Sequence, residues 1–468
     1  MRGDQIHRVI KSTLNDKQFQ SVRTLFRPLY NTFRYDIVQP LQNRSAYYRR
    51  VRSTPSFEFD SRNVLIVTVD CLRNDHLSYA GYGRETTPYL DTVGTYYSRC
   101  VSAAPWTYPS VPSILTGLYP HNHGAVYESD QRNQGIGNPP ATVRDDVYTL
   151  AELLGAGGYE TYFSSAIVTA ELPIRGRFKK ADVHHDAPAE EMVDDFVEWW
   201  SGTDGCKFGY LQLGDLHAPL KRPDEEPFGS VPDITDIEHW DYTQTTSPRN
   251  EFERYRSERV RFYDNVLRYV DSEIRRLFTE LERMGDLSDT IVIVTSDHGE
   301  AFWDHVSLER ERFDDPRDIY GTGHGHTLFP EVVFVPLIVL NADVPSTTGW
   351  VSTTDIVPTV LTELGLSADE QPVTDGIPLH FPDTDRTVRA EEIAYGYDQQ
   401  AVVRDEYLLV DSPHEDESVL IDTTSGDVIQ DDDIEEKLRS YLISEKLTGR
   451  DAVINDRVKQ QLSELGYR

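Results

Sequence analysis

The sequence predicts an α/β fold, with a predominantly parallel central sheet sandwiched by helices and a small antiparallel α+β subdomain at the C-terminal end. Short runs rich in Val and Ile recur along the chain, and they are apolar on both faces. Helical stretches separate these runs, an alternation typical of parallel sheets covered on both sides. From about residue 385, short strand patterns follow one another with polar turns between them.

The elements are expected in a regular order. The run NVLIVTVD at 63–70 predicts the first buried strand. A helix is expected at 86–98, where a Thr precedes a Pro in the first turn, and another at 109–117, which stops at Gly117. Further buried strands are predicted at 206–215, 289–300 and 335–342, and a long amphipathic helix at 253–285.

Three regions are expected. Residues 1–55 form a basic amphipathic helical segment with eleven Lys or Arg against three Asp. Residues 56–384 form the main α/β domain, and residues 385–468 the antiparallel subdomain with a terminal helix. Two interpretations of the basic segment stay open: it packs its apolar face on the main domain, or it lies on an anionic membrane surface.

The composition is strongly acidic, with 79 acidic and 46 basic residues and a net charge of −33. Only nine of the basic residues are Lys. This balance predicts a halophilic protein, because strong screening by salt makes self-repulsion tolerable; the alternative is an ordinary acidic protein. Nucleic acid is excluded as an expected partner, since its phosphates would be repelled.

The spacing of the cysteines and the length of the apolar runs exclude further classes of protein. Cys71, Cys100 and Cys206 have neither a disulfide-framework spacing nor that of a thiolate zinc site. No run approaches 18 apolar residues, and the first ten residues lack the apolar core of a signal peptide. The sequence therefore predicts a cytoplasmic protein, with peripheral contact at the inner membrane face if the basic segment binds lipid.

Polar residues follow three of the predicted strands. Asp70 ends the first strand, and Asp215 and His217 end the strand at 206–215. Asp297 and His298 end the apolar run of the strand predicted at 289–300. The carboxyl ends of parallel strands meet at one edge of a sheet, where ligands bind. One such Asp commonly caps a turn, but three together predict a cation held by oxygen and imidazole ligands.

Thr107 precedes the predicted helix at 109–117. Backbone N–H groups and the macrodipole at a helix N-terminus stabilise an oxyanion. One interpretation is that Thr107 only caps the helix. The other is that its hydroxyl, beside a cation, becomes a nucleophile.

Five motifs in order resemble the sulfatase-like branch of the alkaline phosphatase superfamily, from about residue 62 to 365. They are NVLIVTVDCLRNDHLSYAGYGRETTPYLDTV, PWTYPSVPSILTGLYPHNHG, GDLHAPL, VTSDHGE and GHGHTLFPEVVFVPLIV. The resemblance implies an α/β sandwich and one or two divalent metals. It also implies in-line displacement at sulfur or phosphorus through a covalent enzyme intermediate.

The resemblance also implies roles for single residues. Asp70, Asp297, His298 and Thr107 are the implied metal ligands, and Thr107 is the implied nucleophile. His217 and His324 are the implied catalytic histidines that contact the ester. His305 and His326 compete with His324 for its place. The implied substrate-binding residues are Arg73, His217, His324 and His326, with Asp75 in support.

Two departures from the family pattern shape the expected chemistry. Sulfatases carry Cys or Ser in a C/S-x-P-x-R signature and convert it to formylglycine; here the segment reads TYPSV, with Thr107 and Val111 in those places. Thr cannot give the unbranched aldehyde, because its β-carbon carries a methyl group. Cys71 stands where many sulfatases have a second metal-binding Asp, and with His298 gained the site suits Mn²⁺, Mg²⁺ or Zn²⁺ better than Ca²⁺.

A threonine with these ligands resembles the phosphoglycerol and phosphoethanolamine transferases and the phosphodiesterases. The expected function is therefore metal-dependent cleavage or transfer of a phosphate or sulfate ester through Thr107, with phosphorus preferred. The expected substrate is a small-molecule, glycan or lipid-linked ester. Two alternatives remain: a sulfatase that uses Thr without formylglycine, and a degenerate metal-binding scaffold.

Overall fold

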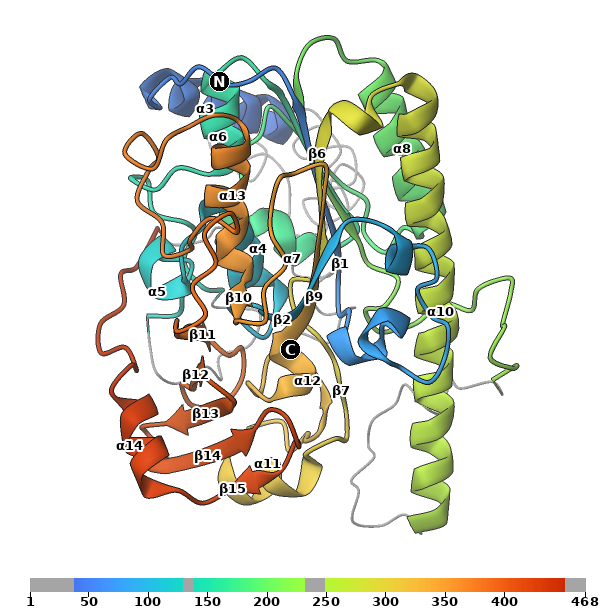
Figure 1. Cartoon of the computed structure of the whole chain (residues 1–468), viewed down its shortest axis with the longest axis vertical. Helices are drawn as coiled ribbons and strands as arrows, with labels where there is room; N and C mark the ends of the chain where they lie inside the picture. The colour runs from blue at the N-terminus through green and yellow to red at the C-terminus, as the bar shows by residue number, and fades with distance from the viewer. Residues whose placement is uncertain (1–37, 129–138, 232–248, 451–468) are drawn as a thin grey trace, which may run out of the picture.

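The structure is a computed structural model that describes residues 38–128, 139–231 and 249–450. An eight-stranded sheet runs through the molecule in the order β10-β2-β9-β6-β1-β5-β3-β4 (Figure 1). In this sheet β9 runs antiparallel to both of its neighbours, and the other strands share one direction. The predicted predominantly parallel sheet is confirmed.

The strands of this sheet are short. They are β1 (Asn63–Val69), β2 (Thr95–Val101), β3 (Glu160–Ser165), β4 (Lys180–Val183), β5 (Lys207–Leu213), β6 (Thr290–Thr295), β9 (Phe334–Leu340) and β10 (Val351–Ser352). A separate hairpin pairs β7 (Ala301–Phe302) with β8 (Thr322–Gly323).

Helices cover both faces of the sheet (Figure 1). The α-helices of the described residues before the C-terminal sheet are α3 (Gln39–Ser53), α4 (Thr107–Thr116), α5 (Pro120–His123), α6 (Leu150–Ala156), α7 (Val168–Glu171), α8 (Ala189–Ser201), α10 (Arg249–Met284), α11 (Val306–Arg312), α12 (Pro330–Val333) and α13 (Ile356–Glu363), of which α11 packs beside the C-terminal sheet. In the described ranges, none of the helices combines the length and the hydropathy that a bilayer crossing requires.

Alternation along the buried strands sends side chains into two cores. Val64 and Ile66 of β1 join the core that packs against α4, α6 and α13. Leu65 and Val67 face the opposite core, against α8 and α10. Because both faces are covered, the strand must be apolar throughout, as its sequence is. Each such side chain contributes about 1.5–3 kcal/mol of burial free energy.

The helix predicted at 86–98 is wrong. A single turn of 3₁₀ helix at Leu90–Thr92 is followed directly by strand β2. Gly94, at φ +70°, turns the chain between them, and a Cβ there would lie 2.6 Å from the Val339 carbonyl oxygen. Pairing of β2 with β9 overrides the helix-start signal that Thr and Pro give. The prediction for residues 109–117 holds, since α4 ends at Gly117.

The C-terminal region carries a second, antiparallel sheet (Figure 1). Its strands are β11 (Val388–Glu391), β12 (Gln400–Arg404), β13 (Tyr407–Ser412), β14 (Glu417–Asp422) and β15 (Val428–Ile429), and α14 (Asp432–Arg439) follows. The Glu391 amide donates to the Ala103 carbonyl oxygen at 3.0 Å, which links this sheet to the segment before α4. The predicted boundary at residue 385 stays a prediction. Of the helical segment expected over residues 1–55, residues 1–37 lie outside the described residues and residues 39–53 form α3.

Candidate active site

Thr107 is the first residue of α4 and is completely buried. Trp106 occupies the N-cap position in extended conformation, and no side chain caps this helix. The Thr107 hydroxyl instead donates to Asp70 Oδ2 at 3.1 Å and lies 3.2 Å from His298 Nε2. The alternative that Thr107 only caps the helix is therefore wrong, and its oxygen lies where the first-turn N–H groups of α4 gather.

The strand ends bring the partners of this oxygen together. Asp70 directly follows β1, and Asp297 and His298 follow β6, the neighbouring parallel strand. His298 Nε2 lies 3.7 Å from Asp70 Oδ1 and 3.7 Å from Asp297 Oδ2. All three side chains are fully buried. The sheet edge thus gathers two carboxylates, an imidazole and a hydroxyl around one point.

Burial shifts the ionisation of these groups. It raises the pKa of Asp297 well above its usual value, and the neighbouring Asp70 raises it further. Burial alone would also raise the pKa of Asp70, but His298, His217 and His324 outweigh it, and the pKa lies below its usual value. Burial and the adjacent His324 lower the pKa of His298 to about 3, so its ring is neutral.

These residues fit a divalent metal ion. One ligand atom each from Asp70, Asp297 and His298 lies within 4.8 Å of the others. His298 Nδ1 is 2.9 Å from the Gly299 carbonyl oxygen and donates to it, which leaves the lone pair of Nε2 facing the carboxylates. Among the residues that the structure describes, no Lys or Arg pairs with either carboxylate. Buried carboxylates are normally paired or bind metals.

Two further histidines lie beside this group. The His324 ring centroid is 4.2 Å from that of His298 and 5.1 Å from that of His217. Glu300 Oε2 lies 2.7 Å from His324 Nδ1 and fixes the orientation of that ring. His217 Nδ1 donates to the Ala218 carbonyl oxygen at 2.7 Å, whereas its buried Nε2 has no hydrogen-bond partner in the described part of the chain. Two imidazoles thus lie beside His298 and the carboxylates.

The main α/β region matches a protein-family model. The model described as Sulfatase matches residues 62–366, about two thirds of the chain. The chain belongs to the sulfatase family. It is therefore an ester hydrolase or transferase of the alkaline phosphatase superfamily. The site described above lies entirely within the matched residues.

Individual sulfatase-family relatives are distant. The chain is 25% identical over 344 residues to the low-salt glycan biosynthesis sulfotransferase Agl7 of Haloferax volcanii, covering 72% of this chain and 69% of the relative. The fold is similar to a protein solved with its substrate D-glucosamine-2-N,6-O-disulfate (TM-score 0.61, 15% identity, 86% and 99% coverage). It is also similar to the phosphonate monoester hydrolase of Agrobacterium radiobacter (TM-score 0.58, 18% identity, 81% and 94% coverage).

Other predicted residues of this sulfatase-family chain have different partners. His326 Nε2 pairs with Glu309 at 3.0 Å, and His305 Nδ1 with Glu331 at 3.0 Å. Among the three competing histidines, the structure brings only His324 into contact with His298. The prediction that His326 binds substrate stays untested, but its ring is already held by a carboxylate.

Arg73 and Asp215 are also engaged elsewhere. The Arg73 guanidinium donates to both Asp75 oxygens and to Asp304, and it is almost fully buried. Asp215 does not join the sulfatase-family carboxylates: its Oδ1 accepts from the Ala189 amide at 3.1 Å, at the start of α8. The expected convergence of strand-end acids therefore holds for Asp70 and Asp297 and is wrong for Asp215.

Gln212 is a site residue that sequence reasoning missed. It lies on β5, and its Nε2 donates to Asp70 Oδ2 and to Asp297 Oδ2, each at 3.0 Å. Ser165 Oγ donates to Gln212 Oε1 at 3.3 Å and so fixes which end of the amide faces the carboxylates. The available signal was an amide within an otherwise apolar strand.

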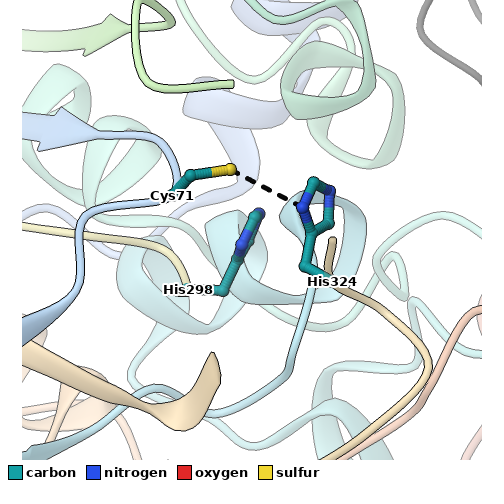
Figure 2. A group of neighbouring side chains, drawn as sticks. All are labelled: Cys71, His298 and His324. Atoms are coloured by element: carbon teal, nitrogen blue, oxygen red, sulfur yellow. Dashed lines mark hydrogen bonds between the residues drawn. The ribbon is translucent and has the colours of Figure 1, made fainter. Parts of the chain in front are cut away.

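Cys71 adds a thiol to the sulfatase-family site. Figure 2 shows its sulfur directed toward the His324 ring, with the His298 ring below the line that joins them. Sγ lies 3.6 Å from His324 Nδ1 and 3.1 Å from Asp70 Oδ1. Burial raises the pKa of this thiol well above its usual value, and Asp70 raises it further, so the thiol stays protonated.

Proposed function

We propose that the protein is a metal-dependent enzyme that takes the phosphoryl or sulfuryl group of an ester onto Thr107 and passes it to water or another hydroxyl. The observation that carries this proposal is the contact of the Thr107 hydroxyl with Asp70 and His298 at the start of α4. A buried threonine that only packed would not need two ionisable partners. Five ordered family motifs support the same assignment.

Asp70, Asp297, His298 and Thr107 would hold the metal ion. When bound, a divalent ion lowers the pKa of a hydroxyl and neutralises charge on the oxygens of a transferred group. Two carboxylates and one imidazole suit Mn²⁺, Mg²⁺ or Zn²⁺ better than Ca²⁺. The unfavourable burial of Asp297 beside Asp70 also supports a cation at this position.

The chain's own residues supply the rest of the transfer. The carboxylate of Asp70 accepts the hydrogen bond of the Thr107 hydroxyl and is placed to receive its proton. Oγ1 then attacks phosphorus or sulfur in line, while the N-terminal amides of α4 face the developing charge. His324, held by Glu300, protonates the leaving oxygen. His217, whose pKa burial lowers, could do so only after it takes up a proton. Water or an acceptor hydroxyl then gives its proton to the same imidazole and attacks phosphorus or sulfur, and the Thr107 oxygen leaves and takes back the proton from Asp70.

The residues after Thr107 support direct use of its hydroxyl. Val111 stands at the place of the arginine in the formylglycine signature, and its side chain is fully buried in the core under α4. A charged side chain there would have to enter an apolar core. We infer that the segment around Thr107 is built for an unmodified hydroxyl, as in the threonine-dependent phosphotransferases.

Sulfuryl transfer is the second candidate. It is favoured by the relative named as a glycan biosynthesis sulfotransferase and by the similar fold solved with a glucosamine disulfate. Phosphorus chemistry is supported by the threonine and by the similar phosphonate monoester hydrolase. In both cases we propose a glycan or other small-molecule ester as substrate.

A panel of model esters tests the proposal. The purified protein is incubated with p-nitrophenyl sulfate, p-nitrophenyl phosphate and bis-p-nitrophenyl phosphate, with and without a chelator. We expect turnover of at least one ester, and loss of that turnover on chelation. No bound metal and no turnover of any ester would contradict the proposal and favour a scaffold.

Replacement of His324 tests the assignment of the leaving-group acid. We expect His324→Ala to slow esters of poor leaving groups by about 10²-fold or more, because protonation matters most there. The p-nitrophenyl ester, whose leaving group needs no proton, should be affected much less. The measurement is kcat for matched phenyl and p-nitrophenyl esters.

His305→Ala is the matched control for this experiment, since His305 pairs with Glu331 instead. Its effect should be the same for both leaving groups. An equal loss of phenyl and p-nitrophenyl turnover in His324→Ala would reject the acid role and leave His217 as the candidate.

A further inference from the structure

A second group of metal-ligand side chains lies at the edge of the main sheet. His184 directly follows β4, the edge strand, while Glu191 and Asp195 lie one turn apart on α8. One ligand atom from each of the three residues lies within 4.8 Å of the others. Because β4 is three strand spacings from β1, about 14 Å, this group is distinct from the candidate active site.

The elements that carry these side chains are well anchored. The His184 amide donates to the Ser165 carbonyl oxygen at 2.9 Å, and its own carbonyl oxygen accepts from the Ala187 amide at 2.9 Å. Helix α8 buries Met192 and Phe196 against the sheet, which turns Glu191 and Asp195 to its outer side. The three ligands are thus held by a strand end and a packed helix, as a metal site requires.

The charges in this group lack a compensating cation. Neither Glu191 nor Asp195 pairs with a Lys or Arg in the part of the chain that the structure describes. By contrast, the neighbouring Asp194 pairs with Arg276. Carboxylates four residues apart on one helix repel each other. His184 Nδ1 lies 3.5 Å from Asp195 Oδ2, but its Nε2 is buried without a hydrogen-bond partner.

A cavity of about 450 Å³ opens beside the group. His184 and Asp195 line it, together with Asp182, Glu198 and Trp199. Lys180 also lines the cavity, but its ammonium is paired with Asp182 at 2.9 Å. The negative surplus that remains is concentrated at Asp195 and Glu198, so the cavity attracts cations and not anionic esters.

We propose that His184, Glu191 and Asp195 bind a divalent transition-metal ion that ties the end of β4 to α8. One nitrogen and two oxygen ligands favour Zn²⁺ or Mn²⁺ over Ca²⁺ and Mg²⁺. Three protein ligands would leave at least one coordination position for water or another ligand. The ion provides the positive charge that the two helix carboxylates lack and gives His184 Nε2 or Nδ1 a partner.

Calorimetric titration of the full-length protein with ZnCl₂ tests this site. The background variant is Asp297→Asn, which removes a ligand of the candidate active site. We expect Zn²⁺ still to bind this variant, and adding His184→Ala or Asp195→Asn to weaken that binding at least about tenfold. Glu198→Gln removes a carboxylate from the same helix and cavity that is not a proposed ligand, and it should weaken binding much less than the ligand variants do.

Glu191→Gln is the variant to use if the other variants fold poorly. Glu191 is exposed, so its replacement changes no packing. Zn²⁺ should raise the melting temperature of the background protein and should not raise that of the same protein carrying Glu191→Gln. The proposal is overturned if the three ligand variants bind Zn²⁺ as tightly as the background. That comparison is between variants, so it holds whatever occurs at the active site.

Discussion

Thr107→Ala is expected to abolish ester turnover, with a loss of about 10³-fold or more in kcat. The alanine side chain has no oxygen that could attack the ester. Asp70 and His298 follow strands of the sheet and cannot replace Thr107 as the nucleophile at the start of α4. Thr107→Ser should keep measurable activity, because its hydroxyl can reach the same partners. The measurement is kcat on the best ester of the panel.

Mass spectrometry of a quenched reaction extends this test. A phosphoryl or sulfuryl adduct should be found on the peptide that contains Thr107. Thr116→Ala is the matched control, since Thr116 lies at the other end of α4 and donates to the Pro112 carbonyl oxygen. It should lower stability by about 1 kcal/mol and leave turnover unchanged. Near-full activity of Thr107→Ala on every ester would refute the nucleophile assignment.

Asp297→Asn is expected to lose both metal and activity. Removing one of two carboxylates leaves too little negative charge to hold a divalent ion in a buried site. The metal-free protein should not be destabilised, because burial and Asp70 make a charged Asp297 unfavourable there. Elemental analysis after dialysis measures the metal, and turnover is measured on the same samples.

Thermal unfolding with and without a chelator gives an independent check. The wild-type protein should lose about 2.7 kcal/mol of stability on chelation if the ion was present at a hundred times its Kd. The variant should lose none through this site. Asp215→Asn is the control, because Asp215 receives a hydrogen bond from α8 and does not face the other two carboxylates. Metal retained at full affinity in Asp297→Asn would exclude Asp297 as a ligand.

Much of the candidate site could be predicted from the sequence. Parallel strands that end in acids place those acids at one edge, and for Asp70 and Asp297 this argument was sufficient. It misplaced Asp215, because a strand-end acid can equally turn toward the helix that packs beside it. It also missed Gln212: an amide within an otherwise apolar strand is a signal, but the sequence does not show which side chains that amide contacts.

The three clustered histidines show a second limit. His305, His324 and His326 share one irregular stretch, and the sequence offers no periodicity that sets their directions. Their carboxylate partners are Glu331, Glu300 and Glu309, respectively. Each partner is so far away in the sequence that the pairing is visible only in the folded chain.

The helix expected at 86–98 failed for a comparable reason. Its start signal is local, whereas β2 forms because β9, about 240 residues later, offers a strand to pair with. Local propensity is a weak prior when a long-range partner is available. The halophilic character predicted from the acidic composition stays a prediction. The same holds for membrane contact through the basic residues 1–55.

Gln212 also bears on whether the site forms before the proposed metal ion binds. Its neutral side-chain amide holds the carboxyl groups of Asp70 and Asp297 side by side through two hydrogen bonds. This arrangement does not require a metal ion. We therefore expect the two carboxylates to be in place before the proposed ion binds. The ion bound in the cell should then depend on which divalent ions are available there, as well as on the preferences of the ligands.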